Sequence, residues 1–324
     1  MQVRLTPFIM GAALLALTRV LPASAAPPAD LSASVAVQGG TLHGTLRLPE
    51  GMGPFPVALI IAGSGPTDRN GNSPMLKTDA YRMLASELAK AGIATLRYDK
   101  RTVGESAMPG VLEADLRFDM FVDDAVQWVK LLQTDRRFRG VSIVGHSEGS
   151  LIGALAAQRV PSVAAVISLD GAGFKAGDVL RSQLRENPAN APILDESLAD
   201  ITSLEAGNHI ATVSPALAAL FRPSAQPYLI SWFKYDPAVE FSKLQVPTLI
   251  VQGTTDLQAS PADAMALSKS APKAKLVMVQ GMNHVLRDVS ADREANFATY
   301  SQPALPLDLQ MVRAVTNFIL HPSS

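Results

Sequence analysis

Residues 144–150, with the sequence VGHSEGS, hold a serine between two glycines at the spacing Gly-x-Ser-x-Gly. This spacing alone is weak evidence, because ordinary residue frequencies produce it by chance in many chains. The flanking sequence is more specific: the apolar run 141–144 precedes the motif, and the small-residue run 151–157 follows it. A strand, this motif and a helix in that order are typical of a nucleophile elbow, in which Ser147 projects from a sharp turn. The simpler alternative is a strand-to-helix turn in which Ser147 caps the helix.

A serine hydroxyl is a weak nucleophile at neutral pH and needs a base that takes its proton and an acid that orients the base. Downstream, the apolar run 248–252 leads to Asp256, and the run 275–279 leads to His284. If both runs are parallel strands, their carboxyl ends meet at the same edge of the sheet as Ser147. The chain order of serine, acid and histidine is that of hydrolases with a nucleophile elbow. We therefore predict a catalytic triad of Ser147, Asp256 and His284.

The sequence offers alternatives for both the base and the acid of the predicted triad. Of the five histidines, only His284 follows the last predicted strand and precedes the final predicted helix; the others are His43, His146, His209 and His321. We expect His146, beside the nucleophile, to pack under the turn. Asp170 follows the apolar run 163–169 and is an alternative acid, because its position could also reach the imidazole. We favour Asp256.

An acyl-transfer site also needs two backbone N–H groups aimed at the oxyanion of the tetrahedral intermediate. One is expected at Glu148, the residue after the nucleophile. The other is expected in the glycine-containing loop that follows the run 56–62, where the amide of Ser64 is the best candidate. The predicted oxyanion hole therefore consists of the backbone amides of Ser64 and Glu148.

Composition excludes several classes of protein. The chain has 324 residues, of which 48% are hydrophobic, enough for a sizeable core. Its 28 basic and 29 acidic residues give a net charge of -1 without long charged runs, so we expect no nucleic-acid partner. The chain has no cysteine, which excludes a thiol nucleophile, a disulfide and a thiolate metal site.

Residues 1–25 have the pattern of a secretory signal peptide. Arg4 supplies the positive start, residues 8–17 are apolar, and Ala-Ser-Ala at 23–25 fits a cleavage site. Arg19 interrupts the apolar stretch, which is therefore short for a membrane span. We predict cleavage near residue 25, export to the periplasm or the medium, and no stable membrane anchor.

The remaining sequence predicts an α/β fold with a mostly parallel sheet. Residues 32–37 and 41–48 alternate in strand fashion around two glycines, which indicates an opening hairpin. Apolar runs that suit strands buried on both faces then alternate with helical stretches. The expected buried strands are 56–62, 93–98, 141–144, 163–169, 247–251 and 275–279. The expected helices are 76–91, 116–132, 149–159, 261–270 and 308–320.

Residues 174–243 interrupt this alternation. No strand pattern appears there, and the stretch is too long for a loop within a compact sheet domain. We predict a helical cap insertion at 174–243, between core segments 26–173 and 244–324. Its apolar residues either line a substrate pocket or pack within the insertion; they are Leu217, Leu220, Phe221, Tyr228, Leu229, Ile230, Trp232 and Phe233.

These residues together resemble the serine hydrolases of the α/β-hydrolase superfamily, particularly exported bacterial esterase-like members related to the serine aminopeptidase type. The motifs that carry the resemblance are GSGPTDR at 63–69, NGN at 70–72, YDKR at 98–101, GHSEG at 145–149, GTTD at 253–256 and NH at 283–284. The resemblance covers residues 56–320 and implies an eight-stranded sheet with the triad named above. Two positions depart from it: Thr102 stands where such proteins often have glycine, and Ala62 where many have histidine.

We predict a serine hydrolase that cleaves small-molecule carboxylic esters of short or medium acyl chains through an acyl-enzyme. No nucleotide fingerprint or metal-ligand cluster appears in the sequence, so no cofactor and no metal are expected. One alternative is an aminopeptidase on the same scaffold, in which acidic residues of the insertion bind a substrate ammonium group; these are Glu186, Asp195, Glu196, Asp200 and Glu205. Another is a binding protein with a dead triad. The oligomeric state stays open.

Overall fold

The computed structural model of this protein describes residues 29–322, so the predicted signal peptide at 1–25 lies outside the described residues. An eight-stranded sheet forms its centre, in the order β1-β2-β6-β3-β7-β8-β9-β10. The strands are β1 Ala29–Val37, β2 Gly40–Leu48, β6 Ala94–Tyr98, β3 Phe55–Ile61, β7 Phe138–His146, β8 Ala165–Leu169, β9 Thr248–Gly253 and β10 Lys275–Val279. β2 pairs antiparallel with β1 and β6, and all the other neighbours in this sheet are parallel. The predicted mostly parallel, eight-stranded sheet is confirmed.

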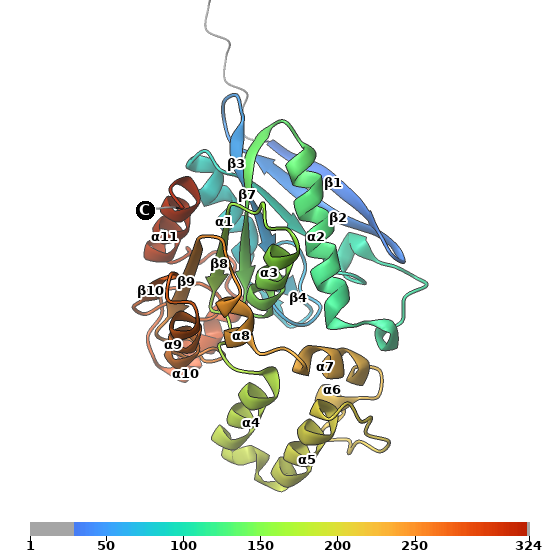
Figure 1. Ribbon diagram of the computed structural model, residues 1–324. Coiled ribbons are helices and arrows are strands. Elements are labelled where there is room, and N and C mark those ends of the chain that lie inside the picture. Colours follow the sequence, from blue (N-terminus) through green and yellow to red (C-terminus); the bar gives the residue numbers. More distant parts are fainter. Residues whose placement is uncertain (1–28, 323–324) are drawn as a thin grey trace, which may run out of the picture.

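The sheet is covered on both faces, as the two-faced apolarity of its strands requires. In β3, Val57, Leu59 and Ile61 pack in the cluster that contains the helices α2 (Phe118–Thr134) and α3 (Glu148–Arg159). Its alternate residues pack in a second cluster with α1 (Ala80–Lys90) and α11 (Leu309–Leu320). Figure 1 shows α2 and α3 lying in front of the strands. A third helix pair, α8 (Pro237–Ser242) and α9 (Pro261–Ser270), packs beside α3.

Two details differ from the sequence prediction. The helix expected from residue 76 begins at Ala80, because Leu76–Lys77 forms the short strand β5, paired with β4 (Asn72–Ser73). The side-chain oxygen of Asn72 accepts hydrogen bonds from the amides of Thr78 and Asp79, which holds this turn outside the helix. The prediction also missed α10, Arg293–Ala298, whose first turn is capped by the Asp292 carboxylate.

Residues 174–243 contain helices and turns but no strand. The helices are α4 (Ala176–Glu186), a 3₁₀ turn (Pro188–Ile193), α5 (Leu194–Glu205), α6 (Ala218–Phe221), α7 (Gln226–Phe233) and α8. Figure 1 shows α4, α5, α6 and α7 grouped below the sheet. They share an apolar cluster of their own, which includes Ile201, Leu204, Leu217, Phe221 and Phe233. Within residues 29–322, no helix is long and apolar enough to cross a membrane.

The helix α3 lies in direct backbone contact with the strands beneath it. A Cβ atom on Gly149 would lie 2.4 Å from the carbonyl oxygen of Ile61, and one on Gly145 would lie 2.1 Å from the carbonyl oxygen of Gly149. Both distances are far below any van der Waals contact, and the obstacles are backbone atoms that cannot rotate away. Glycine is therefore required at both positions.

We expect Gly149→Ala to lower the free energy of unfolding by about 3 kcal/mol or more, because the added methyl group forces α3 away from β3. Gly110→Ala is the matched control, since a Cβ atom there meets nothing within 4 Å. Urea denaturation of both variants and the wild type measures the effect. Equal midpoints for Gly149→Ala and Gly110→Ala would contradict this account of the packing.

Candidate active site

Ser147 stands between the end of β7 and the start of α3 with φ 54° and ψ -123°. A positive φ is uncommon for a residue with a side chain, and such strain persists only where the surroundings enforce it. Here the Ser147 amide donates to the carbonyl of Leu169, 2.9 Å away, while α3 is held against β3. The Ser147 side chain makes no capping hydrogen bond, so the interpretation of Ser147 as a helix cap is wrong.

His284 and Asp256 come together from the loops that follow β10 and β9. The Nδ1 of His284 donates to the Oδ2 of Asp256 at 2.7 Å, and both side chains are buried. The other carboxylate oxygen of Asp256 accepts from the amides of Gln258 and Ala259, at 2.7 and 3.1 Å. Since Nδ1 carries the hydrogen, the Nε2 of His284 has a lone pair with which to accept a proton. This is the arrangement that orients a histidine as a base.

Asp170 does not take this role in the structure. Its Oδ1 accepts from the amide of Gly253 at 2.8 Å, while its Oδ2 is buried without a hydrogen-bond partner among the described residues. Burial, together with the nearby charge of Asp256, raises the pKa of Asp170 well above its usual value. Of the two acids that the sequence offered, the structure pairs Asp256 with His284.

Ser147 and His284 line the same space. A cavity of about 100 Å³ is bordered by both residues, with Tyr81, His146 and Tyr300 among its other walls. A second cavity, of about 200 Å³, is bordered by both residues together with Ser64 and Glu148. No hydrogen bond joins the Ser147 hydroxyl to His284 in the described part of the chain, which is common in sites without substrate. A reactant in these cavities would contact both side chains.

The two amides expected to bind an oxyanion lie beside this space. The Glu148 amide belongs to the first residue of α3, and Ser64 follows β3. The structure gives neither amide a hydrogen-bond partner within residues 29–322. The loop of Ser64 approaches the elbow closely, since a Cβ atom on Gly63 would lie 3.1 Å from the Cβ of Ser147.

A hydrogen-bonded chain ties this loop to the histidine loop. The Gly63 amide donates to the Tyr81 hydroxyl at 3.1 Å, that hydroxyl lies 2.8 Å from the Nδ1 of His146, and the Nε2 of His146 lies 2.8 Å from the carbonyl oxygen of His284. A carbonyl only accepts, so Nε2 of His146 donates, and its Nδ1 accepts the Tyr81 proton. Burial, aided by the charge of His284, lowers the pKa of His146 to about 3 and keeps the ring neutral. No local sequence pattern indicated this role of Tyr81.

The apolar wall of the larger cavity comes mainly from α4 and the loop before it. Phe174, Val179 and Leu180 line it, and α7 adds Trp232. Of the eight apolar residues that the sequence offered for this wall, only Trp232 lines the cavity. Leu217, Phe221 and Phe233 lie in the core of the insertion, Leu229 and Ile230 pack against that core, Tyr228 contacts Glu148, and Leu220 is exposed. Val179 and Leu180 on α4 were not predicted to line a cavity, because polar residues predominate in the sequence of this helix.

The acidic residues of the insertion lie elsewhere. None of the five offered as a possible ammonium site lines either cavity beside Ser147. Glu205 instead pairs with Arg181 at 2.6 Å, and Glu196 accepts from the amide of Ser214. They do not form a charged pocket at the candidate nucleophile.

Among the described residues, one group of three side chains has ligand atoms close enough for a metal ion, namely His146, Asp170 and His284 within 4.8 Å. Both ring nitrogens of His146 are already used in hydrogen bonds, and Nδ1 of His284 is bonded to Asp256. These side chains therefore do not fit a metal site.

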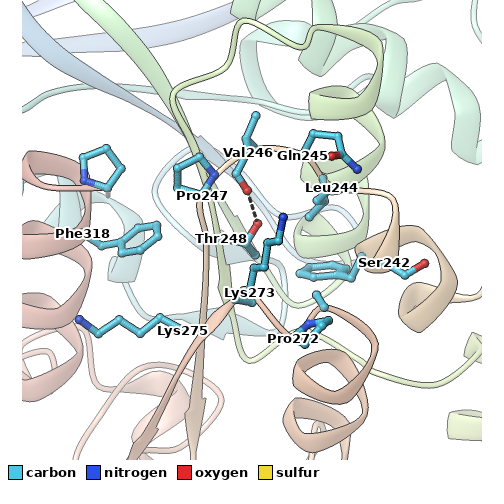
Figure 2. A pocket seen from close by; sticks show the side chains of 14 residues that line it. Ser242, Leu244, Gln245, Val246, Pro247, Thr248, Pro272, Lys273, Lys275 and Phe318 are labelled. Carbon is cyan, nitrogen blue, oxygen red and sulfur yellow. Dashed lines mark hydrogen bonds between the residues drawn. The ribbon is translucent and has the colours of Figure 1, made fainter. Parts of the chain in front are cut away.

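A larger hollow of about 630 Å³ lies at the other end of the sheet. Its lining includes Thr248 and Lys275, the first residues of β9 and β10, with Phe318 of α11 beside them (Figure 2). Asp256 and His284 follow the opposite ends of the same two strands. The hollow is therefore separate from the candidate active site.

Comparison with known proteins finds related chains. A family model described as serine aminopeptidase, S33, matches residues 77–186, a segment that contains Ser147 but neither Asp256 nor His284. Esterase EstD of Thermotoga maritima is 26% identical over an alignment of 253 residues, and the alignment covers 76% of this chain and 58% of EstD. The chain thus spans less than two thirds of the length of this curated relative.

Solved structures share the fold. Est1E from Butyrivibrio proteoclasticus has a TM-score of 0.57 at 19% identity, over 90% of this chain and 98% of that one. The α/β-hydrolase GrgF from a Penicillium species has a TM-score of 0.55 at 18% identity, over 79% of this chain and 91% of that one. Identities this low establish the α/β-hydrolase fold alone, and the predicted fold is confirmed.

The two buried histidines should titrate in opposite ways. Burial alone would lower the pKa of His284, but the charge and hydrogen bond of Asp256 outweigh burial and raise it above 6.5. We expect NMR titration to give His284 a midpoint above 6.5 and to leave His146 neutral from pH 5 to 9. Asp256→Asn should lower the His284 midpoint, because the charge that raises it is gone. A His146 that gains a proton near pH 6 would contradict the hydrogen-bond assignment; His284→Gln identifies the signals.

Proposed function

We propose that this chain, an esterase-like protein of the α/β-hydrolase superfamily, is a serine hydrolase that cleaves carboxylic esters through an acyl-enzyme. The observation that carries the proposal is the Asp256–His284 hydrogen bond at a cavity that the strained Ser147 also lines. A serine hydroxyl and an imidazole border this cavity, and a carboxylate from a third segment holds the imidazole from behind. A strand-to-helix turn with a structural role alone would not require a carboxylate-bound imidazole beside its strained serine.

In the proposed reaction, the Nε2 of His284 takes the hydroxyl proton of Ser147 as its oxygen attacks the ester carbonyl carbon. The amides of Ser64 and Glu148 stabilise the oxyanion that forms, and Asp256 stabilises the protonated imidazole. The intermediate collapses, His284 gives the proton to the departing alkoxide, and the acyl group stays on Ser147. Water, deprotonated by His284, then releases the acid and restores the serine. Because the base must be neutral, hydrolysis should weaken as the pH falls through the raised pKa of His284.

The size of the cavity bordered by Ser64, Ser147, Glu148 and His284 supports a substrate with a short or medium acyl group. Its volume of about 200 Å³ is below the roughly 300 to 1,000 Å³ typical of sites for drug-sized ligands. Phe174, Leu180 and Trp232 supply apolar surface for an acyl chain. We propose a small-molecule ester as the substrate.

A second candidate function is that of an aminopeptidase, which the description of the matching family model favours. Such an enzyme would bind the free ammonium group of its substrate. The acidic residues of the insertion do not line the cavity beside Ser147, so we prefer the esterase function over the aminopeptidase function. A binding protein with an inactive triad is the third candidate, and reaction with a fluorophosphonate probe separates it from both enzymes.

Export remains a proposal based on residues 1–25 alone. Their charged start, apolar stretch and small-residue cleavage site support a periplasmic or secreted protein. Expression of the full chain in a bacterium, followed by fractionation and N-terminal sequencing, tests this proposal.

Ser147→Ala and His284→Ala should each lower kcat/KM for a p-nitrophenyl ester by about a thousandfold or more, because nucleophile and base act as a unit. The Ser147→Ala/His284→Ala double variant should be little worse than either single variant. Circular dichroism serves as the control for folding. Activity above about a tenth of wild type in either single variant would contradict the assignment.

Among p-nitrophenyl esters of increasing acyl length, we expect kcat/KM to be highest for short or medium chains, since longer chains exceed the cavity. An aminoacyl p-nitroanilide measured alongside should react more slowly. A maximum at long chains would contradict the limit that the size of this cavity sets on the acyl group. Faster cleavage of the anilide would favour the aminopeptidase over the esterase.

A further inference from the structure

Lys100 is buried beside the candidate active site, in the YDKR motif whose role the proposed mechanism leaves open. It lies two residues after the end of β6, and its side chain is 5% exposed. Its Nζ donates to the carbonyl oxygen of Gly63 at 2.5 Å and lies 3.6 Å from the Oε2 of Glu148. The ring of Phe121 lies 5.6 Å from Nζ. Burial of an amine is costly, so these contacts must compensate it.

The carbonyl that Lys100 binds belongs to the peptide group between Gly63 and Ser64. A trans peptide is planar, and its C=O and N–H point in opposite directions. The N–H of this same peptide is the Ser64 amide expected to bind the oxyanion. By fixing the carbonyl from the buried side, Lys100 therefore fixes the direction of the N–H on the opposite side.

The second oxyanion donor is connected to the same lysine. Glu148 supplies that donor through its backbone amide, while its side chain extends to Lys100. Burial lowers the pKa of Lys100, and the Glu148 carboxylate opposes this effect. The Lys100 amine carries N–H bonds whether or not it is protonated, so it can donate to the Gly63 carbonyl in either state. The other carboxylate oxygen of Glu148 accepts from the hydroxyl of Tyr228 on α7. One buried network thus joins both amides to the helical insertion.

We propose that Lys100 is a positioning residue that orients the Gly63–Ser64 peptide for oxyanion binding. This inference rests on the proposed function, because it concerns the tetrahedral intermediate of that reaction. The Tyr81 hydroxyl holds the preceding peptide through the Gly63 amide. The loop is therefore fixed at two successive peptide groups, and Lys100 holds the one that donates to the oxyanion.

Replacement of Lys100 should weaken binding of the transition state more than binding of the substrate. We expect Lys100→Met to lower kcat for a short p-nitrophenyl ester by about 10- to 100-fold, somewhat less than loss of an oxyanion donor itself. KM should stay within about threefold, since the ester carbonyl oxygen carries no full charge before attack. Affinity for an alkylboronic acid, which forms a tetrahedral adduct with a serine, should fall along with kcat. Isothermal titration measures that affinity.

The matched control is Arg101→Met, which removes the neighbouring buried cation. Arg101 pairs with Asp124 at 2.6 Å and donates to the carbonyl of Gln38, so it contacts no oxyanion donor. Its loss should lower thermal stability and leave kcat within about twofold.

Lys100→Met combined with Glu148→Gln is the second variant. The single Lys100→Met substitution leaves the Glu148 carboxylate buried without its cation, and the double variant removes that carboxylate as well.

Four outcomes would overturn the proposal. Wild-type kcat and boronate affinity in a folded Lys100→Met, or in the double variant, would show that Lys100 does not position the peptide, although the esterase function would stand. A change in KM alone would place Lys100 in substrate binding. An equal loss of kcat in Arg101→Met would assign the effect to general destabilisation. If the wild type neither hydrolyses esters nor binds the boronic acid, the proposed function and this inference both fail.

Discussion

The candidate active site depends on direct backbone contact between α3 and the strands beneath it. Gly145 and Gly149 allow this contact, because a side chain at either position would meet a backbone oxygen within 2.4 Å. With the helix held so close, the connection between β7 and α3 must be abrupt, and Ser147 takes a φ of 54°. The strained turn raises the hydroxyl above the sheet edge and places the Glu148 amide at the start of the helix. The positions of the proposed nucleophile and of one proposed oxyanion donor thus both follow from a single packing constraint.

The buried charges around the elbow follow a second constraint, since each buried carboxylate needs a compensating partner. Asp256 has His284, and Glu148 has Lys100. Among the described residues, Asp170 has only the amide of Gly253 as a hydrogen-bond partner, and it lies near the charge of Asp256, so its raised pKa favours the neutral carboxyl group. His146 likewise stays neutral, held between Tyr81 and the His284 carbonyl. The charge that the proposed base catalysis requires therefore stays on the Asp256–His284 pair.

Much of this arrangement follows from local sequence patterns. Alternation around two glycines predicted β1 and β2, and two-faced apolar runs predicted the other six strands of the central sheet. The chain order of Ser147, Asp256 and His284 predicted which loops meet. Contacts set by tertiary packing could not be predicted in this way. Nothing near Tyr81 indicates that its hydroxyl lies between Gly63 and His146, and nothing near Lys100 indicates a bond to a carbonyl 37 positions away. In the insertion, apolar residues that fill its own core look the same in sequence as residues that line a cavity, which is why Trp232 alone was placed correctly.

Mass spectrometry can establish whether Ser147 carries the acyl group during turnover. An aryl carbamate reacts like an ester but leaves a carbamoyl group that hydrolyses slowly, so the modified enzyme accumulates. After reaction with the wild-type chain, proteolysis and peptide mapping locate the added mass. We expect one carbamoyl group per chain, on Ser147. A carbamoyl group on Ser64 or on another residue, or steady release of the phenol with Ser147 unmodified, would contradict it.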